Sequence, residues 1–136
     1  MVTLHILKLL EDNGFGTLAL TGAEANASLF FEKLPIQENG IFIMSRGAPL
    51  SKGQRTTQSF DLYSRGENDV VGMQVLEEIL AFFKANAMCT LPSVPGYSDK
   101  EYVNVSITPT GNIQNVGIDD TDRVIYLISA EVRYNN

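Results

Sequence analysis

The sequence predicts an α+β domain: a single mixed or antiparallel sheet of about five strands, with an N-terminal helix and one long central helix packed on it. Residues 101–134 alternate apolar and polar side chains along two limbs separated by Gly, Asn and Asp, which indicates a long C-terminal β-hairpin with one buried face. Residues 70–87 repeat apolar side chains at helical spacing. The 136 residues show no linker, repeat or low-complexity segment, so we expect one domain over residues 1–136.

The first half of the chain is expected to form a helix followed by short strands. Residues 2–12 carry apolar side chains three and four positions apart, and Asn13-Gly14 ends this helix because both residues tolerate the left-handed conformation. Extended segments are expected at residues 17–21, 29–34, 41–44 and 58–63. Residues 41–44 are apolar on both faces, which places that strand inside the sheet.

The central helix is expected to begin after Asn68 or Asp69, either of which can cap a free backbone N–H of the first turn. The main stripe of its buried side is predicted to consist of Val71, Val75, Ile79 and Phe82. A second stripe widens this side and consists of Leu76, Leu80 and Phe83. The side chains of Glu77, Glu78 and Lys84 are predicted to face solvent. Gly72 costs about 1 kcal/mol relative to Ala inside a helix, so we expect it to pack closely on a neighbouring element. Residues 90–100 hold two prolines and are predicted as a connector.

The C-terminal hairpin is the best-specified element. Its first limb places Val103, Val105 and Ile107 on one side; its second places Val124, Tyr126, Ile128, Ala130 and Val132 on one side and Ser129, Glu131 and Arg133 on the other. Between the limbs lie Asp119, Asp120 and Asp122, called the acidic tip below. Their spacing does not fit a calcium loop, so we interpret them as turn residues exposed to solvent.

Composition restricts the possible functions. The formal net charge is −6, from 16 acidic and 10 basic residues, which argues against a dedicated nucleic-acid-binding protein. Cys89 is the single cysteine, so no internal disulfide is possible and a reducing compartment is expected. No apolar run approaches the ~18 residues of a transmembrane helix, and the N-terminal segment resembles a helix more than a signal peptide.

No residue pattern indicates catalysis, so we expect the protein not to be an enzyme and assign no catalytic, cofactor-binding or metal-binding residue. His5 is the single histidine, has no partner with which to form a metal site or triad, and is predicted at a surface or half-buried helix position. Cys89 lacks any motif and is predicted to be packed or partly exposed.

Residues 45–55, called the arm below, read SRGAPLSKGQR and carry the positive residues Arg46, Lys52 and Arg55 together with Leu50. They do not form a phosphate-binding loop, because the lysine precedes the glycine and no helix follows. Two interpretations remain open. The arm is either a mobile interface segment that contacts an acidic partner surface or a long solvated hairpin loop.

Several segments together resemble the tail terminator proteins of long-tailed bacteriophages, which are often labelled phage minor capsid proteins. They are the leading helix ending in glycine, the strand SLFFEKLP, the strand GIFIMSRGAP, the helix beginning near Val70, and the closing phrase ITPTGNIQNVGIDDTDRVIYLISAEVRY. The resemblance spans nearly the whole chain, and its motifs are structural rather than catalytic. The arm is the part that does not match the pattern clearly.

The resemblance implies a structural virion protein that is assembled in the host cytoplasm and located at the head-proximal end of the tail. Such proteins form a ring, usually a hexamer, which caps the tail tube, stops its elongation and presents a surface to the head-completion or connector protein. Double-stranded DNA would pass through the bore without specific binding, and no membrane is involved. Two alternatives stay open: another head-tail completion or tail-tube component, and a small enzyme or nucleotide-binding domain.

Overall fold

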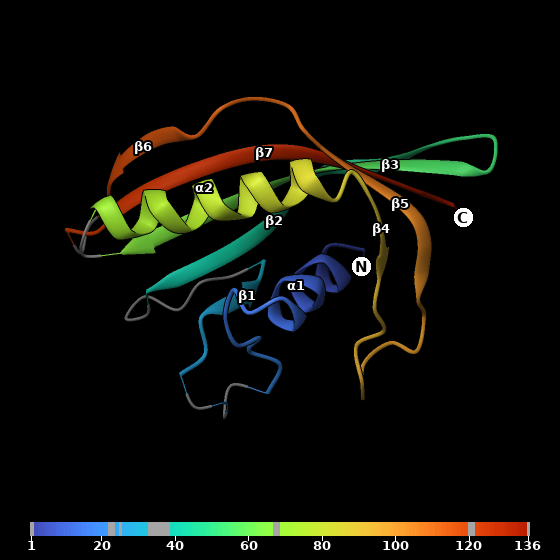
Figure 1. The fold of residues 1–136 in the computed structure, drawn as a ribbon, viewed down its shortest axis with the longest axis horizontal. Coiled ribbons are helices and arrows are strands. Elements are labelled where there is room, and N and C mark those ends of the chain that lie inside the picture. The colour runs from blue at the N-terminus through green and yellow to red at the C-terminus, as the bar shows by residue number, and fades with distance from the viewer. Residues whose placement is uncertain are drawn as a thin grey trace.

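The computed structural model describes residues 2–21, 24, 26–32, 39–66, 69–119 and 122–135. Over these residues the chain forms a seven-stranded mixed sheet that curls into a half-barrel around two helices (Figure 1). The helices are α1 (Val2–Asp12) and α2 (Asp69–Ala85), and the strands are β1 (Leu29–Phe31), β2 (Gly40–Lys52), β3 (Arg55–Gly66), β4 (Met88–Leu91), β5 (Tyr102–Pro109), β6 (Gln114–Ile118) and β7 (Val124–Asn135). The strand order is β1-β2-β3-β7-β5-β4, and β6 pairs with β7 beyond the end of β5.

The predicted sheet of about five strands carrying one long central helix is wrong. Seven strands are present in the described residues, and the helices are short, with 11 residues in α1 and 17 in α2. The two additional strands have only four and five residues: β4 overlaps the start of the predicted connector, and β6 lies inside the predicted hairpin. Strands of four or five residues are too short to show a clear apolar–polar periodicity in the sequence. They form because their neighbours in the sheet stabilise them.

The long ladder of β2, β3 and β7 forms the centre of the sheet. β2 pairs in parallel with β1 and antiparallel with β3, so it lies inside the sheet as predicted. The β3–β7 ladder runs without interruption from Arg55↔Asn135 to Gly66↔Val124. β5 and β4 turn away from this ladder and close the curl on one side (Figure 1).

Helix α1 lies inside the curl, where it packs on β1, β2 and β4 (Figure 1). Its predicted bounds and its predicted stop are confirmed: Gly14 has a φ of 84°, and Asn13 Nδ2 donates to the carbonyl oxygen of Leu9 at 2.8 Å. Seven of its side chains are buried: Val2, Thr3, Leu4, His5, Ile6, Leu7 and Leu10. A helix surrounded by sheet on several sides needs this wide apolar surface.

Helix α2 covers β3, β5 and β7 with a narrower stripe than predicted. Leu76, Ile79 and Phe83 are buried, and Phe83 meets Phe60 of β3 edge to face, with ring centroids 6.4 Å apart. The prediction that Val71 belongs to the buried stripe is wrong, because this side chain is 57% exposed. The close packing expected of Gly72 is confirmed, since a Cβ there would lie 3.1 Å from Ser64 Oγ. Asn68 and the side chain of Asp69 lie outside the described part of the chain, so the capping prediction does too.

Strand β7 alternates as the sequence predicts, whereas β5 does not. Tyr126, Ile128, Ala130 and Val132 are buried on one face of β7. In β5, Asn104 takes a φ of 54°, which breaks the alternation: Val105 and Ile107 are buried, but Val103 is 52% exposed and Tyr102 is buried instead. The prediction that Val103 shares the buried face is therefore wrong, because a left-handed residue turns the strand at that point.

Candidate functional site

The arm is a β-hairpin, so the description of it as a loop is wrong, while its role as an interface segment stays a prediction. β2 continues to Lys52 and β3 begins at Arg55, with Leu50 opposite Thr57 and Lys52 opposite Arg55. Gly47, Ala48 and Pro49 interrupt the alternation in the sequence, and the structure accommodates them in an irregularity between Arg46 and Leu50. Gly53 has a φ of 65° in the two-residue turn, a conformation that favours glycine.

Contacts within the subunit hold two of the three positive side chains of the arm. Arg55 Nη1 donates to the carbonyl oxygen of Asn104 and to Asn135 Oδ1, both at 3.2 Å. Arg46 Nε lies 3.5 Å from Asp61 Oδ1. Near the end of the arm, Lys52 is exposed and Leu50 is 74% exposed. Leu50 and Lys52 are therefore the arm residues best placed to meet another molecule.

A pocket of about 400 Å³ lies at the other end of the β2–β3 ladder, beside the start of α2. It is called the α2 pocket here. Its lining residues come from the segment after α1, the residue before β1, the start of β2, the end of β3 and the first turns of α2: Phe15, Ser28, Asn39, Gly40, Ile41, Ser64, Arg65, Gly66, Val71, Gly72 and Val75. Its walls are mainly apolar. Ser64 is 3% exposed, and its Oγ has no hydrogen-bond partner among the described residues. A buried hydroxyl without a partner costs free energy until a ligand supplies one.

The acidic tip lies at the same end of the molecule as the α2 pocket. Asp119 Oδ2 is 3.5 Å from Nη1 of Arg65, which lines the pocket, and Asp119 Oδ1 accepts a hydrogen bond from the N–H of Arg123 at 3.1 Å. Asp122 is exposed, with a φ of 60°, and its N–H donates to the carbonyl oxygen of Asp119 at 3.1 Å. Both residues therefore lie in a turn, as we interpreted them, but only Asp122 is exposed to solvent, since the side chain of Asp119 is 18% exposed. Asp120 lies outside the described residues.

The sequence places His5 at the surface or half-buried, and this prediction is wrong. His5 is fully buried, its Nδ1 is 2.8 Å from the carbonyl oxygen of Pro92, and its ring meets Tyr102 edge to face. Helical spacing could not reveal this, because it depends on β4 and β5 closing over α1. Cys89 is partly buried on β4, as predicted, and burial raises the pKa of its thiol.

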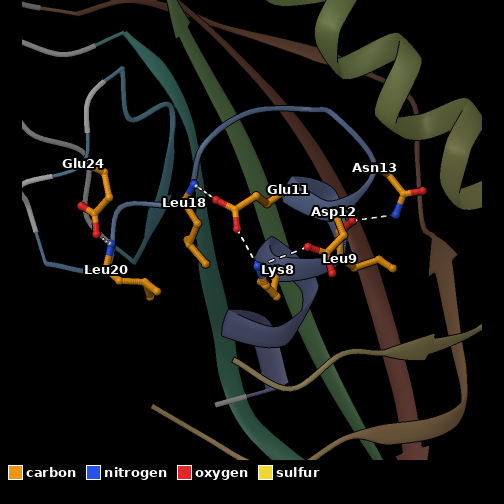
Figure 2. Close-up of polar contacts among 8 residues, drawn as sticks. All are labelled: Lys8, Leu9, Glu11, Asp12, Asn13, Leu18, Leu20 and Glu24. Carbon is orange, nitrogen blue, oxygen red and sulfur yellow. Dashed lines mark hydrogen bonds and ion pairs between the residues drawn. The ribbon is translucent and has the colours of Figure 1, made fainter. Parts of the chain in front are cut away.

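Carboxylates fix the segment that follows α1 (Figure 2). Glu11 binds Lys8 Nζ through Oε1 and the N–H of Leu18 through Oε2, both at 2.7 Å. Burial alone would raise the pKa of Glu11, but the bonds from Lys8 and Leu18 outweigh it and lower the pKa. Glu24 accepts from the N–H groups of Thr21 and Leu20, and these bonds, that from Thr21 first, lower its pKa to about 2.

The described residues hold neither a cluster of metal-ligating side chains nor a membrane-spanning helix. No group of three or more His, Cys, Asp or Glu side chains in this part of the chain is arranged to hold a metal ion. Neither α1 nor α2 has the length and apolarity needed to cross a membrane. Among the described residues, the candidate functional features are therefore the arm, the acidic tip and the α2 pocket. The pocket could not be predicted from the sequence, because its walls come from five separate segments.

Comparison with models of known protein families finds no match, and comparison with curated proteins finds no significant match.

Proposed function

We propose that this protein is a tail terminator: a structural subunit that forms a ring, a hexamer in the proteins it resembles, on the end of a phage tail tube. The ring stops elongation of the tube and offers its other surface to a head-completion protein. The chain acts by its shape and its interfaces and is not an enzyme. Its place is the virion, at the head-proximal end of the tail, after assembly in the host cytoplasm.

The main support for this proposal is that the arm is structured although most of its β2 residues are exposed. The residues of β2 from Arg46 to Lys52 are all exposed, so they contribute little to the core of their own subunit. The arm nevertheless keeps a β-ladder with β3, and β3 continues into the ladder with β7. A structured hairpin that projects from the core and leaves a leucine exposed suits a contact between subunits better than a solvated connection.

The charge of the chain supports the passage of DNA. Each subunit has a formal net charge of −6. DNA carries about one negative charge per 1.7 Å of its axis, so a ring of acidic subunits repels it and lets it slide.

Electron microscopy of the purified protein, alone and mixed with tail-tube protein, tests the proposal. We expect closed rings of one diameter, with a central hole, capping the ends of tubes that stop at a fixed length. If the protein binds along the sides of tubes, or if tubes grow to the same length without it, the proposed function is wrong. A protein that copolymerises into the tube would instead be a tail-tube component.

One observation favours a second candidate, a small ligand-binding domain. The volume of the α2 pocket lies within the range of small-molecule sites, about 300–1,000 Å³. A small molecule that copurifies with the protein and is seen by native mass spectrometry would support this alternative.

A further inference from the structure

The arm and the α2 pocket lie at opposite ends of one rigid ladder. The β2–β3 pairing begins at Gly40↔Arg65, where both residues line the pocket, and ends at Lys52↔Arg55 in the arm. The two ends are well separated along the longest axis of the molecule (Figure 1). Because the same two strands form both, the arm of a subunit cannot fold back into its own pocket. An arm that fills such a pocket has to come from another copy.

The apolar surfaces of the two ends complement each other. Leu50 is 74% exposed in the arm, although water disfavours so large an apolar side chain. The α2 pocket offers Phe15, Ile41 and Val75 as apolar walls, with Val71, itself 57% exposed, at its mouth. Gly72 and the buried Ser64 complete the lining between β3 and α2.

The charges of the two ends are also complementary. Lys52 is exposed two residues beyond Leu50. The pocket end carries Asp119 and the exposed Asp122, and the positive charge of Arg65 at the pocket wall already faces Asp119 at 3.5 Å. Because the carboxylate of Asp119 already pairs with Arg65, a lysine that arrives with the arm meets the exposed carboxylate of Asp122. Contacts of opposite charge at the edge of an interface fix its orientation more than they add affinity.

We propose that Leu50 of one copy occupies the α2 pocket of the next copy, with Lys52 beside Asp122. This inference rests on the proposed function, since it names the contact that closes the ring. The contact is heterologous: it joins two different surfaces, so repeating it gives a closed ring when the rotation between copies closes and an open filament when it does not.

Two variants each disable one side of the contact. Leu50→Asp removes the apolar side chain of the arm and leaves the pocket intact, whereas Val71→Asp puts a charge at the mouth of the pocket and leaves the arm intact. Val70→Asp is the matched control, because Val70 is also 57% exposed in the first turn of α2 but does not line the pocket. Val116→Asp is the control for the arm, since Val116 is 53% exposed on β6. Circular dichroism confirms that all four variants fold.

Sedimentation velocity over a range of concentrations measures self-association. We expect the wild type and both controls to associate weakly and reversibly, and Leu50→Asp and Val71→Asp each to weaken this association by at least about tenfold. Mixing the two defective variants is the decisive step. Each supplies the surface that the other lacks, so one intact contact forms and a heterodimer appears that cannot grow further.

The site of contact is read by nuclear magnetic resonance. Adding unlabelled Val71→Asp protein to isotope-labelled Leu50→Asp protein is expected to shift the amide signals of Ser64, Gly72 and Val75 and to leave those of Cys89 unchanged. Absence of any self-association of the wild type, absence of the heterodimer, or a small molecule already filling the pocket would overturn the proposal. Rings that assemble normally from both defective variants would overturn it too, while leaving the terminator function standing.

Discussion

At the scale of single residues, Glu11 holds the segment after α1 in place. Its carboxylate bridges Lys8 Nζ and the N–H of Leu18, and its side chain is 27% exposed. Because its pKa is lowered from the ordinary value of 4.5 in the folded protein, the stability that it contributes is complete above that value and is lost as the pH falls through the folded pKa.

We therefore predict that Glu11→Gln lowers the free energy of unfolding at neutral pH by about 1–2 kcal/mol, because hydrogen bonds to charged groups are lost. The difference from the wild type should shrink as the pH falls below about 4.5. Asp12→Asn is the control, since its ion pair with Lys8 is longer, 3.2 Å, and Asp12 is 46% exposed. Urea unfolding at several pH values measures both variants. An equal effect at every pH would show that the charge of Glu11 is not what stabilises the segment.

For Ser64 we predict the opposite effect on the stability of the subunit. Its buried Oγ has no partner among the described residues, so Ser64→Ala should leave the isolated subunit as stable or stabilise it by about 1 kcal/mol. Thermal unfolding of the isolated subunit measures this effect. A clear loss of stability in the isolated subunit would mean that the hydroxyl already has a partner there.

At the scale of elements, the arm depends on its turn. Gly53 has a φ of 65°, with nothing near enough to obstruct a side chain, so only the backbone conformation opposes a substitution there. We expect Gly53→Val to place about 1–3 kcal/mol of strain in the turn, to loosen the arm and to increase trypsin cleavage after Lys52. The melting temperature of the core should change little, because the turn lies outside it.

Gly111→Val is the control for this prediction, since Gly111 also has open space around it but no positive φ. Trypsin digestion followed by mass spectrometry locates the cuts. If wild type and Gly53→Val are cut equally fast after Lys52, the arm of the isolated subunit is not held as a hairpin.

The elements that the sequence predicts well are those with long, regular periodicity. The bounds of α1 and the alternation of β7 follow from spacing alone, because each has a full set of apolar residues at the right period. Spacing does not reveal the arm, which contains a bulge, or the kink in β5, which depends on the left-handed residue Asn104. Nor does it reveal the short strands β4 and β6, which depend on the pairing of distant segments. The turn at Asp119 and Asp122 could be predicted, whereas the α2 pocket forms only when five separate segments meet.

At the scale of the whole molecule, the half-barrel separates the arm from the α2 pocket and the acidic tip. A subunit with different and complementary ends builds rings or filaments rather than two-fold dimers. An isolated subunit already buries a core on both helices, so we expect it to fold alone and to associate only weakly until tail tube is present.

Native mass spectrometry tests this prediction. Monomers and small species should dominate for the pure protein, and one species of fixed size should appear after tail-tube protein is added. Open filaments of variable length, or a stable two-fold dimer, would contradict a ring built from head-to-tail contacts.

Electron microscopy of the protein bound to tail tubes tests most directly whether it forms a capping ring. We expect one closed ring on one end of each tube, with the arm of every subunit reaching the α2 pocket of its neighbour. A protein found only as scattered monomers, or decorating tubes along their length, would contradict it.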